Sequence, residues 1–135
     1  MPISKTMPVL VAYDGKEHSK KALCYAIEHS VFYNKTLYIL ASVVSKDDVD
    51  RENELDNIKG FLDAAKKKAQ EQGVDVRTLV EAGNPAEAIL AIAERINAGT
   101  IVTGHSERSA LDRVVTGSVS EHIVRGAHCT VIVVR

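Results

Sequence analysis

Thr100-Ile101-Val102-Thr103-Gly104 and Gly117-Ser118-Val119-Ser120-Glu121 are the two most informative segments of this chain. The first is an apolar run that ends in glycine. It predicts a buried strand with Gly104 at its carboxyl end, where open parallel sheets bind ligands. The second spaces Ser118 and Glu121 as a capping box and predicts a helix start, whose free N–H groups attract anions. We therefore predict a phosphate or small-anion site. Its residues are Gly104, Gly117, Ser118, Val119 and Ser120.

The rest of the chain alternates apolar runs with segments of helical period. This alternation is typical of strand-helix-strand units around a parallel sheet covered on both faces, and it predicts an α/β fold. Residues 74–80 alternate between apolar and polar side chains, which favours an edge strand, whereas the other runs are almost continuously apolar. The five predicted strands are residues 9–12, 37–44, 74–80, 100–103 and 130–134.

Four helices are predicted from apolar positions spaced three and four apart. Asn84-Pro85-Ala86-Glu87 opens the third with an N-cap, a first-turn proline and a capping acid. The fourth runs from Ser118 to about Arg125 and stops at Gly126. The polar stretch 45–52 is expected to be solvated surface. The apolar stripes are Ala22, Leu23, Ala26 and Ile27, then Leu55, Ile58, Leu62, Ala65 and Ala69, then Ile89, Ile92, Ala93 and Ile96.

Length and charge limit the class of protein. The 135 residues are enough for one domain with its own core, and we expect a single domain over residues 1–135. The 17 basic and 18 acidic residues give a formal charge of −1, so no overall field attracts nucleic acid or an anionic membrane. The chain lacks a signal-peptide pattern, and no apolar run approaches the ~20 residues that span a bilayer. We expect a soluble, cytoplasmic protein.

The cysteines and histidines form no recognised metal or disulfide pattern. Cys24 and Cys129 lie far apart without a Cys-x-x-Cys motif, so we expect both to be small core residues in a reducing compartment. The five histidines show no His-x3-His or His-Glu-x-x-His spacing, so no metal site is predicted. His105 follows the Gly104 turn and is either a surface histidine or a pH-responsive phosphate contact.

The glycine segments resemble the nucleotide motif of the universal stress protein family, Gly-x2-Gly-x9-Gly-Ser/Thr. Gly104 and Gly117-Ser118 have the motif's spacing, and Glu107 replaces its second glycine. Residues 118–135 are similar to the family's last helix and strand. Val9-Leu10-Val11-Ala12-Tyr13-Asp14-Gly15 is similar to its first strand and loop. The resemblance covers nearly the whole chain, from Met7 to Arg135.

The resemblance implies an open, doubly wound, Rossmann-like sheet of five parallel strands in the order 3-2-1-4-5. It implies a stress-response protein that binds ATP, ADP or AMP at the carboxyl edge, with or without Mg²⁺ or Mn²⁺. It also implies a homodimer joined through the last strand. The nucleotide-binding positions it implies are Ala12, Tyr13, Asp14, Val43, Thr103, Gly104, Glu107, Gly117, Ser118, Val119 and Ser120. The dimer contacts it implies are Val131, Ile132, Val133 and Val134, an apolar edge unless covered.

Several of these residues allow a second interpretation. Asp14 either contacts a ligand or shapes the turn and caps the helix near Ser19. Val43 is either an adenine contact or ordinary core. Glu107 restricts close backbone approach and brings a carboxylate near the expected phosphates. It therefore favours the alternative of a homodimeric stress protein that binds no nucleotide and acts through protein contacts.

An enzymatic function has little support in the sequence. Gly104-His105-Ser106 begins like the Gly-x-Ser-x-Gly nucleophile elbow, and Asp112 and His122 follow in hydrolase order. However, Arg108 replaces the closing glycine of that motif. The chain also lacks the Gly-x4-Gly-Lys-Ser/Thr phosphate loop. We expect at most weak nucleotide hydrolysis.

Overall fold

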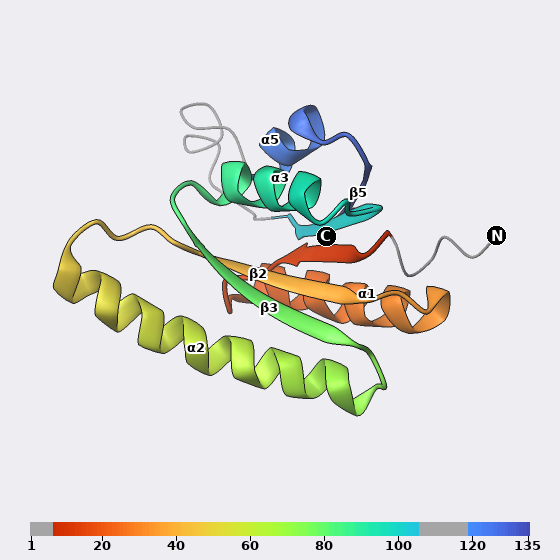
Figure 1. Cartoon of the computed structure of the whole chain (residues 1–135), viewed down its shortest axis with the longest axis horizontal. Helices are drawn as coiled ribbons and strands as arrows, with labels where there is room; N and C mark the ends of the chain where they lie inside the picture. Colours follow the sequence, from red (N-terminus) through yellow and green to blue (C-terminus); the bar gives the residue numbers. More distant parts are fainter. Residues whose placement is uncertain (1–6, 106–118) are drawn as a thin grey trace.

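The computed structural model describes residues 7–105 and 119–135, which contain five strands and four helices. The strands form one parallel sheet in the order β3-β2-β1-β4-β5 (Figure 1). They are β1 (Val9–Ala12), β2 (Leu37–Val43), β3 (Val76–Ala82), β4 (Thr100–Gly104) and β5 (Thr130–Val134). The helices are α1 (Glu17–Tyr33), α2 (Asp48–Glu71), α3 (Pro85–Arg95) and α5 (Val119–Gly126). The predicted doubly wound fold and its strand order are confirmed.

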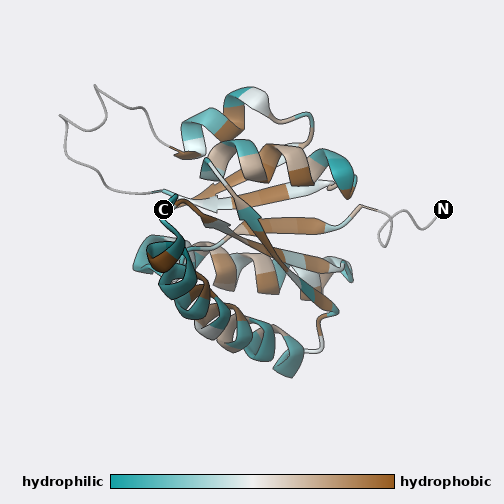
Figure 2. Cartoon of the chain, turned by 60° about the vertical axis from the view of Figure 1, so that its left-hand side comes forward, coloured by the Kyte–Doolittle hydropathy of each residue, from teal (hydrophilic) through white to brown (hydrophobic). Residues whose placement is uncertain are grey.

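The helices α1 and α2 cover one face of the sheet, and α3 and α5 cover the other (Figure 1). Val9 and Val11 of β1 belong to the core shared with α1 and α2, whereas Leu10 belongs to the core shared with α3 and α5. Successive side chains of a strand point to opposite faces, so a strand that is apolar at every position is buried on both. Figure 2 shows apolar residues along the strands and polar ones on the outer turns of α2. Among the described residues, none of the helices combines the length and apolarity that a membrane crossing requires.

The helix ends follow local chemistry. The Asn84 side chain accepts a hydrogen bond from the Glu87 N–H at 3.1 Å, and Pro85 occupies the first turn, so α3 begins where the sequence predicts. Asp47 caps α2 by accepting from the N–H groups of its first turn. α1 ends before Asn34, whose φ of 55° is the left-handed conformation that terminates helices.

The observed β3 lies at the sheet edge as predicted, but its bounds are shifted. It begins at Val76 rather than at residue 74. Val74 is only 7% exposed, and its N–H donates to the Ala69 carbonyl at the end of α2. Val74 therefore fits the alternating pattern because it is buried against the end of α2, before the strand begins.

Three burial predictions are wrong. Leu55 is 40% exposed, so the buried stripe of α2 starts at Ile58. Cys24 and Cys129 are half-buried rather than core residues. Cys24 lies at the margin of the α1 stripe and faces Lys68 of α2. Cys129 precedes β5 and packs, partly buried, against the core under α3 and α5.

Candidate functional site

The strand order creates one special position at the carboxyl edge of the sheet. From β1 the chain moves outward to β2 and β3, then crosses to β4 and β5 on the other side. The connections after β1 and β4 therefore leave in opposite directions, and open α/β sheets bind ligands at such a switch point. We call residues 13–15, which follow β1, and residues 104–105, the last residue of β4 and the one after it, the switch-point edge.

Asp14 organises the turn between β1 and α1. Its Oδ1 accepts from the Lys16 N–H at 2.9 Å and from the Ser19 hydroxyl at 2.6 Å, while Ser19 Oγ accepts from the Asp14 N–H at 3.2 Å. The turn-shaping role near Ser19 is thus confirmed. The Oδ2 atom lies 3.4 Å from His18 Nε2, and the Asp14 side chain is 48% exposed. This second oxygen is the one available to accept from a ligand, which stays a prediction.

Gly104 is a glycine because α1 packs against it. A Cβ at Gly104 would overlap the His18 carbonyl oxygen and would lie 2.8 Å from the carbonyl carbon. The end of β4 therefore contacts the first turn of α1 directly, and this packing requires glycine whether or not a ligand is present. The next residue, His105, continues the ladder by donating its N–H to the Val134 carbonyl at 2.8 Å. The fold thus brings Gly104 and Asp14 together on either side of His18.

Tyr13 lies under α2 rather than at the open edge. It is 8% exposed, and its ring packs edge to face against Phe61 with centroids 5.4 Å apart. Burial raises the pKa of the Tyr13 hydroxyl, and the charges of Lys20 and Lys68 oppose that rise. The Tyr13 side chain is therefore part of the core beneath the switch-point edge.

Phe61 holds α2 over the β1–α1 turn. Gly15 in that turn has a left-handed φ of 81°, and a Cβ there would come within 2.9 Å of the Phe61 ring. Two requirements, the positive φ and the close ring, therefore favour glycine at this position. The available sequence signal for Phe61 is its place three residues after Ile58, beside the buried stripe of α2.

Three other predicted site residues lie in or against the cores. Val43 and Thr103 are 4% and 3% exposed, so their side chains serve packing. The ordinary-core interpretation therefore describes the Val43 side chain, and contact of either residue with a ligand stays a prediction. Ala12 is partly buried against the core under α3 and α5.

Glu54 closes the end of β2, and no local sequence pattern marks this role. Its carboxylate accepts from the N–H groups of Ser45 at 3.0 Å and Val44 at 3.2 Å, which directly follow the strand. These hydrogen bonds, from Ser45 first, lower the pKa of Glu54. Arg51 adds a hydrogen bond from Nε to the Ser45 carbonyl at 3.2 Å. The loop after β2 is therefore tied to the first turns of α2.

The start of α5 supplies the remaining described part of the predicted phosphate site. Val119 packs against the α3 and α5 core, and Ser120 is 6% exposed, so the first turn of α5 is held to the protein body. His122 is exposed on the same helix. Within residues 7–105 and 119–135, no three His, Cys, Asp or Glu side chains gather as a metal site requires. Outside the described residues lie Glu107, Gly117 and Ser118, and also Ser106 and Asp112 of the hydrolase alternative.

Comparison with known proteins identifies the family. The model of the universal stress protein family matches residues 5–135. The chain belongs to the universal stress protein family. Universal stress protein YxiE of Bacillus subtilis is 32% identical, with 94% of this universal stress protein and 97% of YxiE covered. Universal stress protein MJ0531 of Methanocaldococcus jannaschii is 40% identical over 55% of this chain, and that match spans 44% of its own length.

Solved universal stress proteins share the fold. One solved in complex with cAMP has a TM-score of 0.83 at 22% identity, with 96% of this chain and 97% of that chain covered. The Archaeoglobus fulgidus protein in complex with dAMP has a TM-score of 0.76 at 21% identity and the coverages are 96% and 98%. The Arabidopsis thaliana protein with AMP bound has a TM-score of 0.70 at 20% identity, with coverages of 95% and 90%. At these identities the likeness establishes the shared fold.

Proposed function

We propose that this universal stress protein binds an adenine nucleotide at the switch-point edge and acts as a binding protein rather than a catalyst. The observation that carries the proposal is the convergence of Asp14 and Gly104 around His18 at the topological switch point of the sheet. Proteins of this fold solved with cAMP, dAMP and AMP support it. These three ligands share an adenine base, a sugar and a phosphate.

We assign the described residues to two ends of the proposed ligand, an adenosine end and a phosphate end. Asp14 Oδ1 is engaged in the turn, which leaves Oδ2 to accept from a sugar hydroxyl at the adenosine end. The backbone of Ala12 and Val43 borders the same end. The phosphate end belongs to the backbone near Gly104 and the N–H groups at the start of α5, with the motif positions Gly117 and Ser118. The more specific ligand that we propose is ATP, with or without a divalent cation. The Glu107 carboxylate would repel a ligand more strongly the more phosphate groups it carries, so this residue would discriminate among AMP, ADP and ATP.

Calorimetric titration with AMP tests this proposal, with GMP as the control ligand. Asp14→Asn keeps an oxygen for the Lys16 N–H and the Ser19 hydroxyl but replaces the accepting Oδ2 with an amide, so the turn should persist. We expect AMP affinity to fall about tenfold, the loss of one hydrogen bond to a charged group. Asp63→Asn, at an exposed position on α2, should leave the affinity unchanged. No saturable AMP binding, or equal binding by Asp14→Asn and wild type, would overturn the proposal.

The edge strand β5 supports a second proposal, a homodimer. Within the described sheet β5 pairs with β4 alone, and Val133 is 37% exposed. A strand with one free side and apolar side chains is a template for pairing with another chain. We propose that a second copy adds its own residues Val131 to Val134 there. This dimer is compatible with nucleotide binding, and it is also the basis of the alternative in which the protein acts through protein contacts alone.

A further inference from the structure

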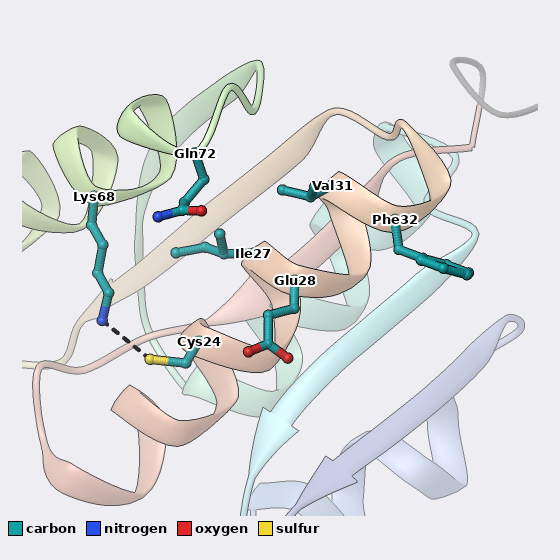
Figure 3. Close-up of a pocket in the computed structure, with 7 residues that line it drawn as sticks. All are labelled: Cys24, Ile27, Glu28, Val31, Phe32, Lys68 and Gln72. Carbon is teal, nitrogen blue, oxygen red and sulfur yellow. Dashed lines mark hydrogen bonds between the residues drawn. The ribbon is translucent and has the colours of Figure 1, made fainter.

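A hollow of about 380 Å³ lies between α1 and α2, apart from the switch-point edge (Figure 3). Ile27, Val31 and Phe32 of α1 form its apolar wall. Cys24 of α1 and Lys68 of α2 face each other across it. Glu28 of α1 also lines the hollow, which therefore combines a nucleophilic sulfur, an amine, a carboxylate and space for a small reagent.

The Cys24 sulfur accepts a hydrogen bond from Lys68 Nζ at 3.1 Å. Cys24 is half-buried and Lys68 is exposed, so small solutes reach the pair from the hollow. An ammonium at this distance stabilises the negative charge on sulfur as it attacks an oxidant. At 3.1 Å from the sulfur, the amine can also reach an oxidised form of Cys24.

Cys129 provides an internal comparison. It is half-buried like Cys24, but burial raises the pKa of its thiol, which reduces the share of reactive thiolate. Among the described residues, the hollow beside Cys129 is lined by Glu94 and His128 and by no lysine. The two cysteines therefore differ in environment, because the described residues place an amine beside the Cys24 sulfur and none in the hollow beside Cys129.

We propose that Cys24 and Lys68 form a peroxide-responsive modification site that closes a covalent sulfur–nitrogen bond between α1 and α2. In the first step the Cys24 thiolate attacks hydrogen peroxide, the O–O bond breaks, and sulfur is oxidised by two electrons. The products are a sulfenic acid and, after uptake of one proton, water. In the second step Lys68, having given a proton to solvent, attacks that sulfur. The S–O bond breaks and the oxygen leaves as a second water, which gives a sulfenamide.

The link would join two helices that cover the same face of the sheet. It would remove one positive charge from α2 and place a covalent bond across the hollow. It would also protect Cys24 from further oxidation, because the sulfenic acid that a second peroxide would attack has been consumed. The link would be reversible, because a reducing thiol that attacks the sulfenamide sulfur returns Cys24 to the thiol. The site would therefore record peroxide exposure reversibly.

Peptide mass spectrometry of the full chain after hydrogen peroxide treatment tests the proposal. In wild type we expect a cross-linked peptide pair of Cys24 and Lys68, lighter by two hydrogens than the sum of the two peptides, that dithiothreitol separates. Dimedone, which labels sulfenic acids, should mark Cys24 at most weakly. In Lys68→Met the link should be absent. Oxidation of Cys24 should be slower without the ammonium, but the dimedone-labelled fraction of the oxidised Cys24 should rise at least tenfold, because no amine consumes the sulfenic acid. The exposed neighbour variant Lys67→Met and the Cys129→Ser variant should both retain the link.

Two results would overturn the proposal. One is a wild-type protein in which Cys24 accumulates dimedone-labelled sulfenic acid without a link to Lys68. The other is oxidation of Cys129 as fast as that of Cys24. Circular dichroism of each variant before treatment verifies that it is folded, and substitution of the exposed Lys67 or Lys68 side chain should leave the spectrum unchanged.

Discussion

Replacing Gly104 with alanine distinguishes two reasons for a glycine at the end of β4. If the glycine serves only ligand approach, alanine should weaken binding and leave stability unchanged. If it serves packing, alanine should destabilise the protein without any ligand present. The contact with the His18 backbone favours the second reason.

The magnitude follows from what the new methyl group meets. A Cβ at Gly104 would overlap the His18 carbonyl oxygen, lie 2.8 Å from the carbonyl carbon and lie 3.3 Å from Cδ2. The first two atoms are backbone of α1, so no rotamer change relieves the overlap, and either β4 or α1 must shift. Overpacking of this kind costs about 1–3 kcal/mol. Alanine has a smaller conformational entropy than glycine in the unfolded state, and this offsets about 0.4–1 kcal/mol of the overpacking cost.

Urea unfolding of the wild type and of Gly104→Ala, followed by circular dichroism, measures the change in free energy of unfolding. Gly60→Ala is the matched control because a Cβ there meets nothing within 4 Å and the residue lies inside α2. This control should gain about 0.5–1 kcal/mol, since alanine is the better helix former. A Gly104→Ala protein as stable as wild type would refute the packing explanation.

Three further predictions concern other parts of the molecule. Glu54→Gln should cost about 1 kcal/mol at neutral pH, because the amide offers one acceptor to the two N–H groups of Val44 and Ser45. The difference in unfolding free energy between wild type and Glu54→Gln should be largest above the ordinary carboxyl pKa of 4.5 and should vanish as the pH falls through the lowered pKa of Glu54 in the folded protein. A difference that does not change with pH would show that the charge of Glu54 is not its cause. In calorimetry, Glu107→Gly should strengthen ATP binding by about 1 kcal/mol and leave adenosine binding almost unchanged, and added salt should reduce the difference in ATP affinity between variant and wild type. Equal ATP affinity in the two proteins would contradict the proposed repulsion. Ile132→Lys should give monomers or aggregates in sedimentation, and a monomeric wild type at micromolar concentration would exclude the β5 dimer.

The fold was predictable because its signals are local. Continuous apolar runs mark strands buried on both faces, and the alternation in β3 marks an edge. Asn84 and Pro85 mark the start of α3 through chemistry within one turn. The pattern fails at Val74, where a nonlocal contact decides the structure. Val74 is apolar like a strand residue, but its N–H donates to the Ala69 carbonyl at the end of α2.

The candidate site was predictable only in position. Strand ends and glycine turns place Asp14 and Gly104 at one edge, and the fold confirms that placement. Tertiary structure brings together the atoms that explain two other features. One is the contact with His18 that requires glycine at position 104, and the other is the closure of β2 by Glu54. The proximity of Cys24 and Lys68 is likewise invisible in sequence, since 44 positions separate them.

Nuclear magnetic resonance of ¹⁵N-labelled protein during a titration with AMP tests nucleotide binding at the switch-point edge, because it reports binding and its location together. We expect saturable shifts of the amide signals of Tyr13, Asp14, Gly15, Gly104 and His105 and of the first turn of α5. The signals of β3 and of the hollow between α1 and α2 should remain in place. Unchanged spectra up to millimolar AMP, or shifts confined to a region away from the switch-point edge, would contradict the claim.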